Sequence, residues 1–518
     1  MPCCFLHRRA AAHPRPEGET ALLLRIKRAW GDPPALAAWS VAAASSAGAH
    51  CRWPYVRCDS AGRVTELALT NANISGAFQW QHTGDPVQAL EASVPQAPRV
   101  GEAELLLQIK HAWGDPPVLA AWSAAAASLV MIGISITGPV PDAQPPNWTP
   151  LQPCTPRHPG VPIHMLRNLR YLVLDSNRLT GAIPAELGEL TNLETLWLAN
   201  NPFHAGELPA SFKNLTNLTK LWAANCSLTG DFPSYLVKMP KLEQLYLDDN
   251  SLTGTIPPGI WGLKKLQRLF VRRNNLTGDL VIDGFAAMSL AAIDLSENNL
   301  TGRIPEVFGH LENLTHLSLL GNNFTGKIPV SISHLPSLNT LLLSTNKLTG
   351  MLPPELGKHS SSLNVIMVDE NDLTGPIPEG LCARGPLWFL SASRNHFNGS
   401  IPASLAKCDT LVDLNLGSNQ LSGKVPEALW TAGQIQWVIL DNNHLTGSLP
   451  ATLPSSLVWL YIENNQFVGR IPSVAVALEH FIAENNMFSG EFPANLAYGM
   501  PLLQQLNLAN NKLSGKIH

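Results

Sequence analysis

The sequence predicts an α/β repeat solenoid, in which short coils stack with a parallel β-sheet on the concave face and a cap over the N-terminal end. Three observations support this prediction. A pattern L-x-L-x-x-N-x-L-x-G-x-I-P recurs, with variations, fifteen times between Leu172 and Ile517. Its asparagine position recurs every 21 to 25 residues, mostly every 24, as in an array of stacked units. A segment with tryptophans and a cysteine pair precedes the array. The asparagine column comprises Asn177, Asn201, Cys226, Asn250, Asn274, Asn298, Asn322, Asn346, Asn371, Asn395, Asn419, Asn443, Asn465, Asn486 and Asn511.

Each repeat is predicted to contribute one short strand to the concave sheet. Leu245 and Leu247 alternate with Tyr246, so a strand would direct both leucines to the core and the tyrosine outward. The side chain of Asn250 is suited to satisfy backbone groups of adjacent coils, so the asparagine column is expected to be structural. Gly254 permits backbone angles that larger residues resist. This combination is that of a leucine-rich repeat.

The second half of each repeat is predicted to fill the convex side. A proline follows the glycine and fits an irregular edge segment because it lacks an amide hydrogen. A Leu-x-x-Leu rhythm comes next, as in Leu187, Leu190 and Leu193. With about 4.8 Å per strand, fifteen coils would make a curved ribbon roughly 65 to 70 Å long, a geometry that requires no enclosed cleft.

The chain is predicted to divide into four parts, one of which contains a duplicated cap. Gly18 to Ala47 reappears 83 residues later as Gly101 to Val130, with 22 of 30 positions identical. Only the first copy is followed by a cysteine pair. The predicted parts are an unassigned N-terminus (1–17), a cap with a first degenerate repeat (18–80), a linker with the partial duplicate (81–160), and an array of about fifteen repeats that is truncated at its C-terminal end (161–518).

Composition and motifs favour a binding protein. The chain has 518 residues, a net charge of −4 and no long basic run, so no nucleic-acid partner is expected. It contains no phosphate-binding loop, no Rossmann motif, and neither the His-Arg-Asp nor the Asp-Phe-Gly segment of protein kinases. We therefore expect no catalytic residue and no cofactor, because repeat arrays act mainly through extended binding surfaces.

Ten Asn-x-Ser/Thr sequons are compatible with a glycosylated secretory protein, although Asn-Asn-Leu-Thr is also simply part of the repeat. Against secretion, Met1 to Glu19 lacks the apolar core of a signal peptide. The uncharged run from Val118 to Gly138 is rich in alanine and serine and ends like a repeat, so a membrane span is disfavoured there. The sequons lie at Asn73, Asn147, Asn214, Asn217, Asn225, Asn275, Asn299, Asn313, Asn323 and Asn398.

The cap and the Gly-x-Ile-Pro form of the repeats resemble the extracellular portion of plant leucine-rich-repeat receptor-like kinases, including the HAESA-like peptide receptors. That cap carries Leu-Leu-x-x-Lys, a tryptophan and C-x-W-x-G-V-x-C. The resemblance covers most of Gly18 to Phe78 and all of Leu172 to His518. It implies a ligand-binding ectodomain at the extracellular side of the plasma membrane, or in the apoplast, without the membrane helix and kinase domain of the family. The matching residues are Leu23, Leu24, Lys27, Trp39, Cys51, Trp53, Val56 and Cys58, with Tyr55 at the glycine position.

Two disulfides are expected. A solenoid end exposes apolar core, so a cap is required, and Cys51 with Cys58 is the expected bridge there. A metal site is disfavoured because no histidine pair has ligand spacing. The family resemblance implies a second bridge, between Cys382 and Cys408 on neighbouring coils. Cys226 is expected to be a core thiol, and no partner is assigned to Cys3, Cys4 or Cys154.

The candidate ligand site is a column of outward-facing aromatic residues on four consecutive strands. Large exposed aromatic area is uncommon without a partner, and three arginines lie beside its last member, so an extended peptide with apolar and charged groups is the expected ligand. The alternative is that the rings merely stack on one another. A second, sparser column contains Phe389, Trp437 and Trp459. The candidate residues are Trp197, Trp222, Tyr246, Phe270, Arg268, Arg272 and Arg273.

Another pair of positions argues against one ligand chemistry. HAESA-like receptors use an Arg-x-Arg pair to hold a peptide carboxylate, and the matching positions here are Asp413 and Asn415. An aspartate would repel that carboxylate. Arg272 and Arg273 are adjacent and are expected to point in different directions, so they would not substitute for the pair.

Two functions follow from the resemblance. The first is an ectodomain that recognises a peptide or protein ligand in cell-surface signalling, with a co-receptor ectodomain as a further partner. The alternative is a soluble cell-wall defence protein similar to the polygalacturonase-inhibiting proteins, which share the repeat but usually have fewer coils.

Overall fold

The computed structural model describes residues 23–24, 27, 32–40, 49–70, 72, 75–77 and 166–516. All of them belong to a unit formed by residues 1–80 and 158–518. Several predictions fall outside the described residues. These are the unassigned N-terminus, the duplicated cap, the uncharged run from Val118 to Gly138, the sequons at Asn73 and Asn147, and the three cysteines Cys3, Cys4 and Cys154.

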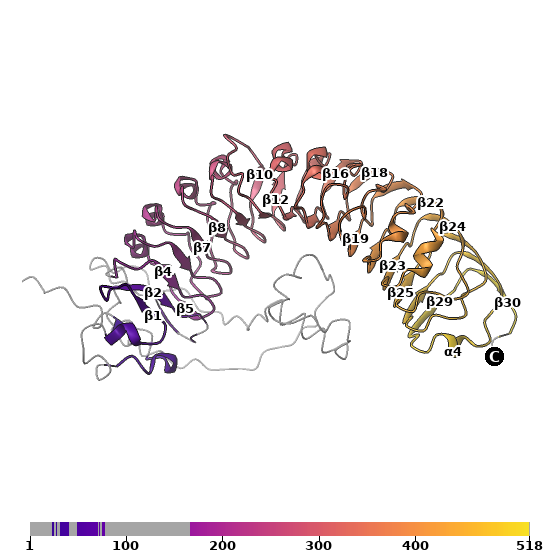
Figure 1. The fold of residues 1–518 in the computed structure, drawn as a ribbon, viewed down its shortest axis with the longest axis horizontal. Coiled ribbons are helices and arrows are strands. Elements are labelled where there is room, and N and C mark those ends of the chain that lie inside the picture. The colour runs from indigo at the N-terminus through magenta and orange to yellow at the C-terminus, as the bar shows by residue number, and fades with distance from the viewer. Residues whose placement is uncertain are drawn as a thin grey trace, which may run out of the picture. The chain divides into compact units, whose positions relative to one another are not determined.

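A 17-stranded sheet runs through this unit, and the repeat array curves with the sheet on its inner side (Figure 1). Strand β1 pairs antiparallel with β2, and all later pairings in the sheet are parallel, as predicted. Leu67 of β2 lies opposite Leu172 of β4, so these two strands are neighbours in the sheet although they are far apart in the chain. The strands are β1 (Val56–Cys58), β2 (Val64–Ala68), β4 (Tyr171–Val173), β6 (Thr195–Trp197), β7 (Lys220–Trp222), β8 (Gln244–Tyr246), β9 (Arg268–Phe270), β11 (Ala292–Asp294), β13 (His316–Ser318), β15 (Thr340–Leu342), β17 (Val365–Met367), β19 (Phe389–Ser391), β21 (Asp413–Asn415), β23 (Trp437–Ile439), β25 (Trp459–Tyr461), β27 (His480–Ile482) and β29 (Gln505–Asn507).

From β4 onward, the middle residue of each strand in this sheet faces the core. Leu172, Leu196, Leu221 and Leu245 are all fully buried. Strand residues on either side of them therefore point to the concave surface, as the alternation of side chains in a strand requires. The predicted concave sheet and its leucine ladder are confirmed.

A second set of strands, which the repeat pattern did not predict, follows the asparagine column. It is built from the Leu-Thr-Gly part of the repeat, where a glycine takes positive φ, as at Gly254 (φ +74°). A Cβ atom at Gly254 would lie 2.9 Å from the carboxylate of Asp231 in the preceding repeat, so a side chain there would displace Asp231 and would also strain the left-handed backbone. These strands are β3 (Ser75–Ala77), β5 (Arg178–Thr180), β10 (Thr277–Asp279), β12 (Asn299–Thr301), β14 (Thr325–Gly326), β16 (Lys347–Gly350), β18 (Asp372–Gly375), β20 (His396–Gly399), β22 (Gln420–Lys424), β24 (His444–Ser448), β26 (Gln466–Gly469), β28 (Met487–Glu491) and β30 (Lys512–Ser514).

Short helices form the convex side of the array and part of the cap, and most of them are single 3-10 turns entered through a proline. Pro257, for example, directly precedes η9. The predicted leucine rhythm is confirmed, because Leu187, Leu190 and Leu193 are fully buried. The helices are η1 (Pro34–Leu36), η3 (Ala49–Arg52), η6 (Ala185–Glu189), η7 (Ala210–Asn214), η8 (Ser234–Lys238), η9 (Pro258–Gly262), η10 (Glu306–His310), η11 (Val330–His334), η12 (Leu405–Lys407), η13 (Glu427–Thr431) and α4 (Leu496–Gly499).

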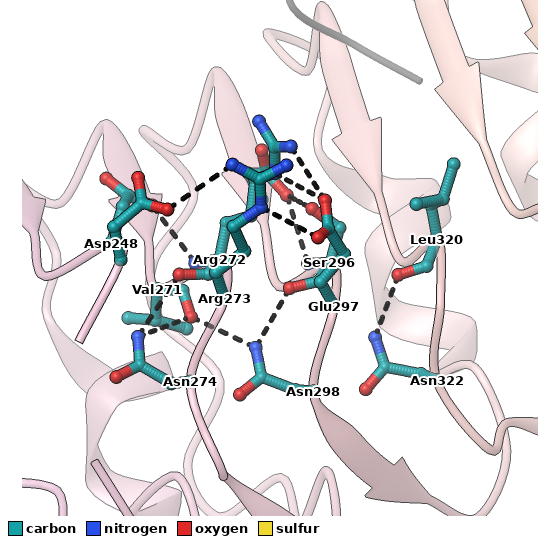
Figure 2. Close-up of polar contacts among 12 residues, drawn as sticks. Asp248, Val271, Arg272, Arg273, Asn274, Ser296, Glu297, Asn298, Leu320 and Asn322 are labelled. Carbon is teal, nitrogen blue, oxygen red and sulfur yellow. Dashed lines mark hydrogen bonds and ion pairs between the residues drawn. The ribbon is translucent and has the colours of Figure 1, made fainter. Parts of the chain in front are cut away.

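The asparagine column is a hydrogen-bonded ladder inside the array, as predicted. The Asn298 amide donates to the carbonyls of Val271, Leu295 and Ser296 at 3.0, 3.1 and 3.0 Å. Its own carbonyl accepts a bond from the Leu276 N–H at 3.1 Å. Each asparagine thus joins its own coil to the preceding one (Figure 2).

Cys226 interrupts the ladder and is a buried free thiol, as predicted. Its Sγ lies 3.3 Å from the carbonyl of Leu198, but no amide oxygen is present to accept from the preceding coil. The corresponding donor there, the N–H of Phe203, bonds instead to the carbonyl of Asn201 within its own coil. A local change of backbone pairing therefore compensates for the missing asparagine.

The cap closes the N-terminal end over the first coil. Leu23 and Trp39 are fully buried, and Lys27 donates to the carbonyl of Trp39 at 2.9 Å. The rings of Trp39 and Trp53 stack with centroids 5.7 Å apart. Disulfides join Cys51 to Cys58, and Cys382 to Cys408, with Cα atoms 5.5 and 5.8 Å apart, so both predicted pairings are confirmed.

Candidate functional site

The aromatic column, which consists of Trp197, Trp222, Tyr246 and Phe270, occupies one register position on β6 to β9. All four side chains are half-buried on the concave face. Adjacent rings meet edge to face, with centroids 5.4, 6.3 and 5.1 Å apart along the column. The rings therefore support one another and also present a continuous apolar strip. This arrangement agrees with both a ligand surface and simple stacking between rings.

The three candidate arginines have different surroundings. Arg268 is exposed and donates to the hydroxyl of Tyr246 at 3.2 Å. Arg272 donates to Glu297 Oε1 at 2.7 and 2.9 Å, and Arg273 donates to Glu297 Oε2 at 2.7 Å. Two guanidinium groups thus share one carboxylate (Figure 2).

The prediction that Arg272 and Arg273 point in different directions is wrong. It assumed extended backbone at both residues, but Arg273 has φ of +51°, which ends the alternation of side chains. Position 273 is one of a column of left-handed residues directly before the ladder asparagines. Both arginines consequently converge on Glu297, a residue that sequence analysis did not select.

Buried acidic groups underlie the last part of the aromatic column. Burial and the charge of Asp294 raise the pKa of Asp248 well above its usual value. Asp294 itself accepts bonds from the N–H and the hydroxyl of Ser296. Burial lowers the pKa of His316, whose ring lies 6.2 Å from that of Phe270. Asp248 also accepts a bond from the backbone N–H of Arg272 at 3.0 Å, so buried acidic groups lie directly beside the segment that carries the candidate arginines.

The second aromatic column lies at the first position of strands nearer the C-terminus. Phe389, Asp413, Trp437, Trp459 and His480 are in register across β19 to β27. The rings of Trp437 and Trp459 are 6.3 Å apart, and those of Trp459 and His480 stack at 5.3 Å. The single acidic residue in this aromatic series is Asp413.

The surroundings of Asp413 disfavour the binding of a negatively charged group. Burial, together with the charge of Asp369, raises the pKa of Asp413 to about 7. Unlike Asp413, the carboxylate of Asp369 accepts hydrogen bonds from the hydroxyls of Ser344, Ser391 and Ser393. A further carboxylate would add repulsion where acidic charge is already destabilised, which agrees with the prediction that this position does not hold a peptide carboxylate.

Most sequons within the described residues present the asparagine to solvent. Asn217 and Asn323 are half-buried, and Asn217 donates to the carbonyl of Thr191 at 2.8 Å. Asn225 is exposed and follows Trp222 by three residues, in the turn after β7. The exposed sequon asparagines are Asn214, Asn225, Asn275, Asn299, Asn313 and Asn398.

Metal-ligating and membrane features were sought within the described part of the chain. One group there, His50 with Cys51 and Cys58, has ligand atoms close together, but both sulfurs are in the disulfide and cannot act as thiolates. Among the same residues, none of the helices has both the length and the apolar character needed to cross a bilayer.

Comparison with known families identifies the repeats. Family models described as leucine-rich repeats match residues 167–205, 216–276, 288–348 and 410–432. A model described as the leucine-rich-repeat N-terminal domain matches both 16–59 and 101–129, the two copies predicted as caps. The chain is also 40% identical over 58 residues to polygalacturonase inhibitor 1 of Oryza sativa subsp. japonica, a match that covers 11% of this chain and 16% of the inhibitor.

Solved structures resemble much more of the chain. The ectodomain of the Arabidopsis receptor kinase HAESA, solved with an IDA peptide hormone, has 27% identity and a TM-score of 0.65, with coverage of 96% of this chain and 86% of that one. PEPR1 with AtPEP1 has 26% identity and a TM-score of 0.66, covering 95% and 62%. The receptor kinase GASSHO1/SCHENGEN3 of Arabidopsis thaliana has the same identity and TM-score, covering 95% and 56%. The chain therefore contains leucine-rich repeats with a leucine-rich-repeat N-terminal domain, and it is similar in structure to the ectodomains of plant receptor kinases.

Proposed function

We propose that this protein recognises an extended peptide along its concave face, with the aromatic column as the apolar part of the contact. The half-buried edge-to-face strip of Trp197, Trp222, Tyr246 and Phe270 carries this proposal. Aromatic residues supply much of the binding energy at protein interfaces, because they bury large area at little cost in entropy. HAESA, PEPR1 and RGFR1 were each solved with a peptide ligand, which supports the same ligand class here.

Arg268 would provide the first polar contact for such a peptide. It is exposed beside the column, whereas Arg272 and Arg273 are engaged with Glu297. A ligand carboxylate would have to compete with Glu297 for those two arginines. We therefore expect Arg268 to contribute more to ligand affinity than either neighbour.

The cellular setting of this function is an extension of the same proposal. Exposed sequons and two disulfides suit the extracellular side of the plasma membrane or the apoplast. A co-receptor ectodomain is a further proposed partner. The array would act by binding, with no catalytic residue of its own.

The proposal is tested by footprinting. Peptides would be selected from a random displayed library on the full chain, and the complex would then be oxidised with hydroxyl radicals. A peptide length of about 14 residues is chosen because about 13 extended residues are needed to reach from Trp197, past β9, to β21. We expect bound peptide to protect Trp197, Trp222 and Tyr246 from oxidation. The exposed Tyr498 lies outside both aromatic columns and serves as an internal control. Equal oxidation of the column with and without peptide would refute the assignment.

A soluble inhibitor of polygalacturonase is the second candidate, favoured by the 58-residue match to the rice inhibitor. A fungal polygalacturonase assay with increasing amounts of this protein distinguishes the two. Stoichiometric inhibition would support the second candidate and displace peptide recognition.

A further inference from the structure

The second aromatic column contains polar atoms that lack partners. Asp413 Oδ1 and Trp459 Nε1 are almost entirely withdrawn from solvent and have no hydrogen-bond partner among the described residues. Glu463 Oε2, two residues after the end of β25, also lacks a partner among the described residues. A buried polar atom left unpaired costs about 1 to 3 kcal/mol, so native structures contain few of them.

The charge around these atoms is negative. The pKa of Glu463 is raised by burial, with Asp441 and Glu484 adding to the effect, just as Asp369 does for Asp413. Within the described residues, neither Asp413 nor Glu463 forms an ion pair. Arg394, in the repeat before Asp413, is paired with Glu370. The acidic surface therefore has no internal counter-ion comparable to the arginines that neutralise Glu297.

Aromatic faces flank the acid. Phe389 and Trp437 occupy the equivalent positions on the strands before and after Asp413, about 4.8 Å away on each side. Trp459 follows one strand further and stacks on His480, whose Nδ1 lies 2.9 Å from the Tyr461 hydroxyl. A carboxylate between aromatic rings is suited to a cation, which gains both a charge-assisted hydrogen bond and attraction to the ring faces.

We infer that the Asp413 subsite, defined as Asp413 with Phe389 and Trp437, binds a cationic group of the ligand, either an alkyl-guanidinium or an alkyl-ammonium. The cation donates to the Asp413 carboxylate and lies against the flanking rings. This inference rests on the proposed peptide function and assigns the ligand a charge at one point along its length.

The array sets the spacing between the two subsites. Phe270 on β9 and Asp413 on β21 are separated by six strand steps, through β11, β13, β15, β17 and β19. At about 4.8 Å per step this is roughly 29 Å, which an extended peptide spans with about nine residues. The cationic residue is therefore expected about nine positions from the peptide segment that contacts the aromatic column.

The test uses peptides selected on the full chain, measured by calorimetry near pH 8, where Asp413 is mostly ionised. Each peptide is compared with versions in which its basic residue is arginine, lysine, citrulline or glutamate. We expect arginine or lysine to bind about tenfold more tightly than citrulline, and glutamate to bind more weakly still. The arginine and lysine versions distinguish a guanidinium from an ammonium.

Variants separate this inference from the proposed function. Asp413→Asn keeps the shape of the side chain and should weaken the basic peptides about tenfold while leaving the citrulline version unchanged. Asp413→Arg should reverse the preference toward the glutamate peptide. Peptides that bind through the aromatic column but respond to neither variant would overturn the inference alone. Failure to select any peptide would overturn the proposed function.

Discussion

Replacing Asn298 with alanine should destabilise the array, because this side chain forms four buried hydrogen bonds. It donates to three carbonyls in two coils and accepts the N–H of Leu276 at 3.1 Å. Alanine leaves the Leu276 N–H without an acceptor and weakens the three carbonyl contacts. One orphaned buried donor costs about 1 to 3 kcal/mol, and the weakened carbonyls add to this, so we expect a loss of about 3 kcal/mol.

An aspartate at the same position tests the direction of these bonds. Asn298→Asp has nearly the same shape but presents an oxygen, instead of an N–H donor, to the carbonyls of Val271, Leu295 and Ser296. An ionised buried carboxylate facing acceptors is worse than an absent side chain, so we expect the aspartate variant to lose about 4 kcal/mol or more near pH 7.

The assay is guanidinium unfolding of unglycosylated protein, followed by circular dichroism and by hydrogen exchange of the flanking coils. Hydrogen exchange is needed because repeat arrays can unfold in parts. Asn299→Ala is the matched control, since the adjacent side chain is exposed and should change stability by less than about 0.5 kcal/mol. Equal stabilities of Asn298→Ala and Asn299→Ala, or an unaffected Asn298→Asp, would refute the ladder's role.

Three further predictions concern titration, reactivity and cross-linking. Because the pKa of Asp413 is raised from 3.8 to about 7, its stability contribution is complete below pH 3.8 and is lost as pH rises through about 7. Asp413→Asn should therefore gain about 2 to 4 kcal/mol over wild type at pH 8 and little at pH 4, and equal gains at both pH values would contradict this. Burial raises the pKa of Cys226 to about 12, so peptide mass spectrometry should find it unalkylated by iodoacetamide in native protein; labelling without denaturant would count against its burial. Replacing Cys382 and Cys408 together by serine opens a 26-residue loop and should cost about 3 kcal/mol in denaturant unfolding, whereas an unchanged midpoint would exclude a stabilising bridge.

The sequence predicted the scaffold well because its signals are local and repeated many times. The spacing of the asparagines defines the register, and the register alone places Trp197, Trp222, Tyr246 and Phe270 on neighbouring strands. The disulfides followed from a motif and from family resemblance. Nothing in these inferences required knowledge of a side-chain conformation.

Contacts between repeats were less predictable because they depend on side-chain conformations and on backbone angles outside the strand. The pairing of Arg272 and Arg273 with Glu297 follows from the left-handed conformation of Arg273, three residues after the end of β9, at a position where the repeat has no fixed residue type. Asparagine is frequent at the position directly before each ladder asparagine, and it tolerates positive φ. This preference could have been used to predict the left-handed conformation of Arg273.

The sequence also did not predict the electrostatic surroundings of individual side chains. Sequence alone marked Asp413 as unsuited to a carboxylate ligand, but not as an unpaired acid between aromatic rings. Asp369, whose charge raises the pKa of Asp413, lies 44 positions earlier in the chain. Only the stacking of coils brings such residues close enough to affect each other's pKa.

The central claim, that the concave aromatic column binds the ligand, is tested most directly by a triple variant. Trp197→Ala, Trp222→Ala and Tyr246→Ala are combined and compared with a Tyr498→Ala control, whose ring is 90% exposed away from the column. For peptides selected on the wild-type chain, we predict a loss of affinity of at least about a hundredfold in the triple variant, with an unchanged circular dichroism spectrum. A triple variant that keeps wild-type affinity would contradict the account.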